Sequence, residues 1–233
     1  MTLSNQLDYW PPSMMKGTRM IRHIVGMLIL AWGNWFLTEV AAQAQDQLEP
    51  GFKSLFDGKT FQGWKISENP QSWSIRDGAI VANGPRSHLF YVGDDQPFVN
   101  FELKVDVMTH ENSNGGIYFH TRFQPEGWPV AGFEVQVNNS YKDPQKTGSL
   151  YGVVKIYESP AKDREWFTEH ITVKGKNIVV RVNDKIVVDY TEPMGAQPGK
   201  DFRRVLDSGT FALQAHDPGS TVYYKNIRVK RLE

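Results

Sequence analysis

The stretch Gly132–Asn139, GFEVQVNN, alternates between apolar and polar side chains. One side of the strand that it predicts is apolar and consists of Phe133, Val135 and Val137. The other side presents one carboxyl and two amide groups, from Glu134, Gln136 and Asn138. A period of two residues is typical of a β-strand with one buried and one accessible face. A carboxyl group beside two amides suits the hydroxyl groups of a sugar, and a solvated face of an antiparallel sheet is the alternative explanation.

Other short segments with strand character flank this stretch on both sides. In chain order they span residues 73–75, 79–81, 88–92, 98–109, 117–123, 149–156, 166–173, 177–182, 185–190, 209–215 and 221–229. The turns Asp77-Gly78 and Asn183-Asp184 join two of the pairs and indicate β-hairpins. No segment after residue 44 keeps a helical period. The pattern therefore predicts an all-β protein, a jelly-roll β-sandwich of about a dozen antiparallel strands.

The composition indicates one domain and excludes several classes of function. With 233 residues, of which 40% are hydrophobic, the chain can bury one sizeable core. Its 26 basic and 26 acidic residues are mixed along the sequence, so no basic stripe argues for nucleic acid as a partner. The absence of cysteine excludes disulfides, thiolate metal sites and a cysteine nucleophile.

The first 44 residues have the pattern of a signal peptide. Arg19, Arg22 and His23 precede an apolar run over residues 24–37, and Ala42-Gln43-Ala44 forms a small-residue cleavage site. A membrane anchor is the alternative, but the run is shorter than the ~20 residues that a span needs. Translation could also start at Met15 or Met20. The expected organisation is a signal peptide over 1–44, a linker over 45–52 and one domain over 53–233, without a membrane span in the mature, secreted or periplasmic form.

The same alternation on neighbouring strands suggests more residues for an accessible sheet face. These candidates are Tyr118, His120, Arg122, Gln214 and His216 from strands, Trp128 from a loop, and Tyr151 with Lys155 from segment 149–156. If the strands adjoin, they form a concave face that binds a saccharide by hydrogen bonds, with Trp128 stacked on a sugar ring. Gln136 and Asn138 would share this face with Glu134.

Each candidate also has a structural explanation. His216 can anchor the turn that begins at Asp217, and His120 can be a buried sheet histidine with its polar atoms paired. Glu134 can form an ion pair with Arg122. Three tryptophans are expected in the core rather than in a site: Trp64, Trp73 and Trp166.

The usual glycosidase mechanism needs two carboxyl groups on either side of the scissile bond, ~5 to 10 Å apart. The central stretch offers one acid, Glu134, because the next two accessible positions are Gln136 and Asn138. The protein therefore either binds sugar without cleaving it or acts on a substrate that carries its own activation.

Six segments in order resemble the 3-keto-disaccharide hydrolase family. They are LFDGKTFQGW (55–64), NGGIYFHTRF (114–123), GFEVQVNN (132–139), TGSLYGVV (147–154), ITVKGKNIVVRVNDKIVVDY (171–190) and LQAHDPGSTVYYKNIRV (213–229). The resemblance covers Gly51–Leu232 and implies a concanavalin A-like lectin or glucanase jelly roll secreted by bacteria. The family pattern suggests a His-Gly-Asp-like turn, whereas this chain has His216-Asp217-Pro218-Gly219.

This resemblance implies cleavage of glycosides that carry a ketone at carbon 3. The ketone acidifies the hydrogen on carbon 2, so a base can remove it, the glycosidic oxygen can leave from carbon 1, and water can then add. Such a site needs a base, a group that holds the enolate and a proton donor. The expected roles are Glu134 or His216 as base; Arg122, Gln136 or Lys155 at the oxyanion; and Tyr151 or His120 as donor.

The resemblance also sets expectations about cofactors and partners. No cofactor is expected, because no tight ligand spacing demands one, although a divalent ion held by His and Glu would also stabilise an enolate. The substrate would be a carbohydrate, oxidised beforehand by a sugar 3-oxidoreductase. A non-catalytic, lectin-like carbohydrate-binding module is the main alternative, and a structural domain of an envelope complex is a third, since one fold hosts several functions.

Overall fold

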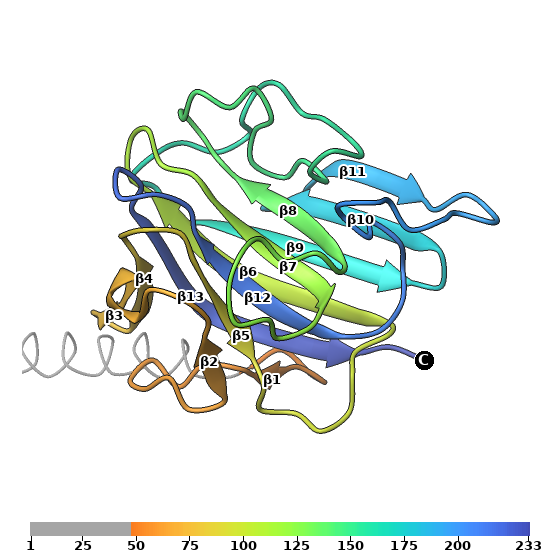
Figure 1. Ribbon diagram of the computed structural model, residues 1–233, viewed down its shortest axis with the longest axis horizontal. Helices are drawn as coiled ribbons and strands as arrows, with labels where there is room; N and C mark the ends of the chain where they lie inside the picture. The colour runs from red at the N-terminus through yellow and green to blue at the C-terminus, as the bar shows by residue number, and fades with distance from the viewer. Residues whose placement is uncertain (1–47) are drawn as a thin grey trace, which may run out of the picture. The chain divides into compact units, whose positions relative to one another are not determined.

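The computed structural model describes residues 48–233, so the expected signal peptide lies outside the described residues. Two antiparallel sheets pack face to face as a jelly-roll β-sandwich, which confirms the expected all-β fold (Figure 1). The larger sheet has the strand order β11 (Lys185–Thr191), β10 (Asn177–Val182), β9 (Phe167–Lys174), β6 (Phe101–Thr109), β13 (Val222–Arg231), β4 (Ala79–Ala82) and β3 (Trp73–Arg76), with β1 (Lys53–Ser54) paired to β13. The smaller sheet has the order β2 (Trp64–Ile66), β5 (Ser87–Tyr91), β12 (Thr210–Ala215), β7 (Gly115–Thr121) and β8 (Phe133–Val137).

The larger sheet buries one face, as strict alternation predicts. Along β6 every second residue is buried and the residues between are half-buried. Strand β9 repeats this pattern beside it, with seven residue pairs in register from Phe101–Val173 to Val107–Phe167. The buried rows of both strands pack into the core between the sheets.

The smaller sheet is different, because three of its strands are buried on both faces. Every residue of β5, β7 and β8 is buried, polar ones included. One face packs on the core, and the other lies under segments that follow β7, β8 and β11. These segments hydrogen-bond to β8 or to each other, as in Tyr151 N–H to Glu134 O at 2.9 Å and Arg203 N–H to Val130 O at 2.7 Å. The accessible face expected for Glu134 is therefore a covered one.

A β-bulge interrupts strand β7 near its end. Thr121 pairs with Thr210 and Phe119 pairs with Phe211, which leaves His120 as the extra residue, with φ +54°. The bulge ends the alternation that the sequence predicts from residue 117 to 123. The His120 ring consequently packs against Phe119 and, across the sandwich, against Phe101.

Segment 149–156 is not the strand that the sequence predicts. It forms only isolated bridges, Leu150 with Val135 and with Val154, around a turn at 151–153. Gly152 has φ +75° in this turn, a conformation that favours glycine. Tyr151 and Lys155 therefore do not share a strand face.

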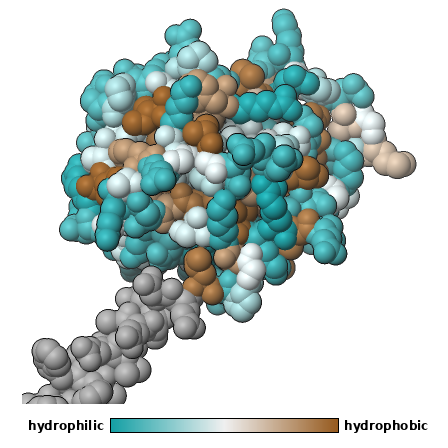
Figure 2. All heavy atoms as spheres, turned by 90° about the horizontal axis from the view of Figure 1, so that it is seen from below, coloured by the Kyte–Doolittle hydropathy of each residue, from teal (hydrophilic) through white to brown (hydrophobic). Residues whose placement is uncertain are grey.

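Of the three tryptophans expected in the core, Trp64 and Trp73 are buried there, and Trp166 is not. Trp166 is 40% exposed and lies under the ammonium group of Lys225, 3.9 Å from the ring centroid. On the face seen in Figure 2, hydrophobic residues are interspersed among hydrophilic ones. Between residues 48 and 233 there is no helix long and apolar enough to cross a membrane.

The bulge in β7 predicts an unusual sensitivity at Gly132. This residue has φ +80°, and a Cβ atom there would lie 2.1 Å from Phe119 O. Because the neighbouring atom is backbone, Gly132→Ala should lower the free energy of unfolding by about 4 kcal/mol and Tm by roughly 8 to 16 °C, as measured by chemical and thermal denaturation.

Gly195→Ala is the matched control for this experiment. Gly195 has φ +74°, but no atom lies within 4 Å of the added Cβ. It should cost only the left-handed backbone strain of about 1 to 2 kcal/mol. Equal losses in the two variants would contradict the role assigned to the bulge.

Candidate functional site

A cavity of about 480 Å³ lies on the covered face of the smaller sheet. Strands β7, β8 and β12 supply its floor, and the segments that cover the sheet supply its walls. The lining residues are Asn114, Tyr118, Trp128, Glu134, Gln136, Tyr151, Gly152, Phe202, Arg204, Gln214 and His216. Seven of the eleven candidates from the sequence are among them: Tyr118, Glu134, Gln136, Gln214, His216, Tyr151 and Trp128.

The strand register creates the space that the Glu134 side chain occupies. Tyr118 of β7 pairs directly with Glu134 of β8, and Gly116 pairs with Gln136. Paired residues point to the same face of a sheet. A Cβ atom on Gly116 would come within 2.6 Å of Glu134 Oε1, so glycine at this position leaves room for the carboxyl group where it lies.

Glu134 is a buried acid with a strongly altered acidity. Its side chain accepts a hydrogen bond from Gln214 Nε2 at Oε1, 2.9 Å away, and Arg204 Nη2 lies 3.8 Å from Oε2. Burial raises the pKa of Glu134 to about 7, although a hydrogen bond from Tyr118 and the charge of Arg204 act in the opposite direction. The carboxyl group is therefore divided between its neutral and ionised forms near neutral pH.

Arg204 is a cationic wall residue that the sequence did not indicate. Its Nη1 donates to Gly132 O at 2.9 Å, which fixes the guanidinium group beside Glu134. The cation also lies 4.9 Å from the ring centroid of Phe202. Segment 192–209 has no periodicity that could have marked either residue.

His216 directly follows β12 and is oriented by an acid. Its Nδ1 lies 2.7 Å from Asp217 Oδ2. Burial raises the pKa of Asp217, but hydrogen bonds from His216, Ser220 and the Gly219 N–H outweigh burial and leave this pKa below its usual value. An ionised Asp217 favours the His216 tautomer that carries its proton on Nδ1, and in that tautomer Nε2 has a lone pair for another group.

Tyr151 faces the cavity from the turn that replaces the expected strand. Its hydroxyl donates to Asp143 Oδ2 at 3.0 Å. Burial and this contact raise the pKa of Tyr151 to about 12. The phenol is therefore neutral, and its oxygen offers the cavity an acceptor rather than a free proton.

Amide groups and one indole complete the lining. Gln136 Nε2 donates to Asn114 Oδ1 at 3.1 Å, so the two amides act as one fixed pair. Asn114 was not among the candidates, although it precedes the Gly115-Gly116 pair of the NGGIYFHTRF segment. Trp128 lies with its ring centroid 5.3 Å from that of His216.

Two predicted site residues are buried elsewhere. Asn138 follows β8, and its amide nitrogen donates to Asp143 O and Gln145 O, which fixes the loop after the strand. His120 is turned into the sandwich by the bulge, and its Nε2 bonds with Val99 O at 2.9 Å. The expectation that both residues share the accessible face with Glu134 is wrong, because one lies past the strand end and the other lies at a register shift.

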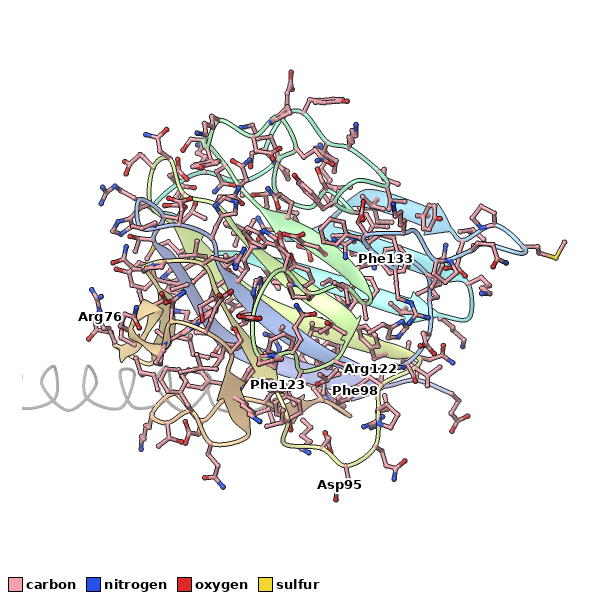
Figure 3. The ribbon with its side chains drawn as sticks, in the orientation of Figure 1. Arg76, Asp95, Phe98, Arg122, Phe123 and Phe133 are labelled. Carbon is pink, nitrogen blue, oxygen red and sulfur yellow. The ribbon has the colours of Figure 1, made fainter. Side chains whose placement is uncertain are left out.

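Two others lie at the surface, away from the cavity. Arg122 forms an ion pair with Asp207 at 2.9 Å rather than with Glu134, and it lies at the end of β7 near Phe98 and Phe123 (Figure 3). Lys155 is exposed beyond the turn that contains Tyr151. Neither residue therefore lies on the sheet face on which the sequence analysis places it. Within residues 48–233, no group of three or more His, Asp or Glu side chains is arranged to hold a metal ion.

Comparisons with known proteins agree with this fold and point to one family. A 3-keto-disaccharide hydrolase of Bacteroides thetaiotaomicron is 26% identical to this chain, over 78% of this chain and 79% of that protein. A candidate glycosyl hydrolase of Parabacteroides distasonis has a similar structure, with a TM-score of 0.67 and 23% identity over 81% of this chain and 99% of that one. A carbohydrate-binding module from Bacillus subtilis shares the fold at a TM-score of 0.52 and 13% identity, over 72% and 95% of the two chains.

The family itself is identified by sequence over almost all of the described sandwich. Residues 51–230 match the family described as the 3-keto-alpha-glucoside-1,2-lyase-like domain. This span includes every strand that contributes to the cavity floor and every lining residue. The chain belongs to the 3-keto-alpha-glucoside-1,2-lyase-like domain family.

Proposed function

We propose that this protein cleaves glycosides whose sugar carries a ketone at carbon 3, by proton abstraction from carbon 2, elimination and hydration. The observation that carries the proposal is that one carboxyl group, Glu134, lines the cavity. A two-carboxylate displacement has no second acid among the lining residues. An elimination needs only a base, a proton donor and groups that hold an enolate, and the family membership supports a substrate of this kind.

His216 is the base of the proposed reaction. Its Nε2 takes the proton from carbon 2, and the electron pair of that bond moves toward the ketone to form the enolate. The imidazolium that results is stabilised by the ionised Asp217, 2.7 Å from Nδ1. A carboxylate that orients a histidine and stabilises its charge is a common arrangement for a general base.

Glu134 is the proton donor to the glycosidic oxygen. When the enolate collapses, the ketone re-forms, a double bond forms between carbons 1 and 2, and the bond from carbon 1 to the leaving oxygen breaks. The neutral carboxyl of Glu134 gives its proton to that oxygen, and its pKa of about 7 suits this transfer near neutral pH. Water then adds across this double bond: its oxygen bonds to carbon 1, one of its protons goes to Glu134, and the imidazolium of His216 returns a proton to carbon 2, which yields the free 3-keto sugar and restores both residues.

Arg204 and the Gln136–Asn114 pair would hold the enolate oxygen. A guanidinium group and fixed amide donors act strongly on developing negative charge where bulk water is excluded. Arg122 and Lys155 cannot act there, because both lie outside the cavity. Tyr151 would accept a hydrogen bond from a sugar hydroxyl, since its own proton is directed to Asp143.

The proposal extends to the setting of the reaction. The signal peptide expected over residues 1–44 would send the protein out of the cytoplasm. A separate sugar 3-oxidoreductase would supply the ketone. Carbohydrate binding without cleavage is the second candidate, and a cavity lined by amides and Trp128 would also serve it.

The direct test is to incubate residues 45–233 with a 3-keto-α-glucosyl-glucose and with its unoxidised parent, with and without a chelator. Release of free sugar from the keto form alone is the expected result. Binding of either compound without cleavage would favour the carbohydrate-binding module. Loss of activity with the chelator would show that a metal takes part.

The role of Glu134 predicts a dependence on both pH and leaving group. Because the neutral acid is the active form, kcat should fall as pH rises through about 7. Glu134→Gln should remove this limb and lower kcat for a disaccharide by roughly 10² to 10⁴-fold. The loss should be much smaller with a p-nitrophenyl leaving group, which departs without a proton. An equal loss for both substrates would rule out Glu134 as the donor.

The same substitution should increase stability. Between pH 4.5 and 7 the unfolded chain releases the Glu134 proton while the folded chain keeps it, so this residue makes the free energy of unfolding fall as pH rises. The free energy of unfolding of Glu134→Gln should not fall in this way. At pH 8 this variant should therefore be more stable than the wild-type protein, by on the order of 3 kcal/mol at most. Urea denaturation of both proteins at pH 4.5 and pH 8 checks this, and a constant difference would contradict the burial of an ionisable acid.

Asp217 tests the assignment of the base. Asp217→Asn replaces the carboxylate with a neutral amide and removes the charge that stabilises imidazolium. It should lower kcat by roughly 10² to 10⁴-fold and change the Kd of the unoxidised disaccharide by less than twofold. Ser220→Ala removes one of the hydrogen bonds to Asp217, and the one that Ser220 Oγ accepts from Asn114 N–H, but it keeps the carboxylate, so it should have a much smaller effect on kcat. Similar kcat losses in the two variants would indicate that Asp217 only shapes the turn.

A further inference from the structure

His88 is a buried polar residue beside the cavity with no explanation in the fold. It lies in β5 directly opposite Gln214 of β12, so its side chain projects from the same sheet face as a lining residue. The side chain is 0% exposed. Neither ring nitrogen has a hydrogen-bond partner in the part of the chain that the structure describes.

Such a residue is costly to the fold. Burial lowers the pKa of His88 to about 3, so the ring is neutral at any physiological pH and holds one N–H donor and one nitrogen acceptor. Unpaired polar atoms in an apolar site destabilise a protein, and a phenylalanine would fill this space without that penalty. Phe90 shows that the same strand and face accept an aromatic hydrocarbon. No described residue pairs with the two ring nitrogens of His88, so a bound ligand could form hydrogen bonds with them.

Two lining residues of the cavity, Trp128 and Tyr118, pack on His88. The ring centroid of Trp128 lies 5.6 Å from that of His88 and 5.3 Å from that of His216, and the ring centroid of Tyr118 lies 5.4 Å from that of His88. The backbone of the loop is fixed by the side-chain amide of Gln124, which donates to Trp128 O at 2.8 Å and accepts from Val130 N at 3.1 Å. A rotation of the indole about its side-chain bonds would leave these backbone contacts intact.

The contacts on the outer side of Trp128 are weak ones. The guanidinium group of Arg86 lies 5.2 Å from the ring centroid and is itself paired with Glu68 at 2.8 Å. Both members of this pair are partly exposed, and ion pairs at the surface contribute little to stability. Glu68 also accepts a hydrogen bond from Gly127 N–H at 3.0 Å, so the ion pair is tied to the loop backbone and reaches the indole only through Arg86.

We propose that Trp128 is a movable cover, and that its rotation extends the cavity to His88 and opens a second subsite for the sugar that leaves. This inference rests on the proposed function, because it gives the disaccharide substrate a place for its second ring. The neutral imidazole offers a donor and an acceptor to neighbouring hydroxyls of that sugar. The indole then stacks beside the ring rather than over His88.

The test compares two ligands that differ only in the leaving group, methyl 3-keto-α-glucoside and 3-keto-α-glucosyl-glucose. Their dissociation constants are measured by calorimetry in the Glu134→Gln background, in which cleavage of the disaccharide is expected to be slowed by roughly 10² to 10⁴-fold. His88→Phe should weaken disaccharide binding about tenfold more than it weakens methyl glycoside binding, which is the ratio expected for one lost hydrogen bond. His88→Gln, which keeps a donor and an acceptor, should recover part of that ratio.

Phe90→Leu is the matched control on the same strand and sheet face, and it should change the ratio by less than twofold. Equal weakening of both ligands in His88→Phe, or none, would overturn the subsite. Failure of the proposed function would give a different result. The wild-type protein would not cleave the disaccharide, although the ratio of the two dissociation constants could still be measured.

Movement of the cover has its own measurement. The disaccharide should change the tryptophan fluorescence of the protein, the methyl glycoside should change it less, and Trp128→Phe should abolish the difference between them. An identical change with both ligands would contradict a rotation that is coupled to the second sugar.

Discussion

The candidate site depends on one constraint, the burial of strand β8 on both faces. Phe133, Val135 and Val137 pack into the core, while Glu134 and Gln136 face a cavity that other segments cover. A carboxyl group in this position loses most of its hydration, and its pKa rises to about 7. The floor of a β-sandwich thereby gains an acid that can hold or release a proton near neutral pH. The covering segments make this chemistry possible, because without them Glu134 would face water.

Two features hold the covering segments in place: backbone hydrogen bonds at the edge of the smaller sheet, and the β-bulge in strand β7 of that sheet. Segment 149–151 hydrogen-bonds to β8 and brings Tyr151 over the cavity, and segment 203–204 hydrogen-bonds to the loop of Trp128 and brings Arg204 beside Glu134. The β7 bulge needs glycine at Gly132, because a larger residue would meet the carbonyl of Phe119. The rigid sandwich thus positions the loops that line the cavity, an arrangement that is common in enzyme active sites.

The site also concentrates groups that weaken the folded state. Glu134 and His88 lie in the covered region, and each is buried at a cost in hydration. Proteins retain such groups where function requires them, since a sequence selected for stability alone would replace them with apolar residues. The larger sheet holds one further buried acid, Glu169 of β9, whose carboxyl oxygens have no hydrogen-bond partner among the described residues and which does not line the cavity.

The sequence by itself determined most of the strands, the sandwich and the identity of the central acid, because alternation is a local property that burial of one face enforces. It also indicated Tyr118, Gln136, Gln214, His216, Tyr151 and Trp128, all of which line the cavity. Tertiary structure alone decided which other residues join them. His120 and Arg122 do not line the cavity because one extra residue in β7 changes the register. Arg204 and Asn114 were missed because they reach Glu134 and Gln136 through contacts between distant segments, which no local period records.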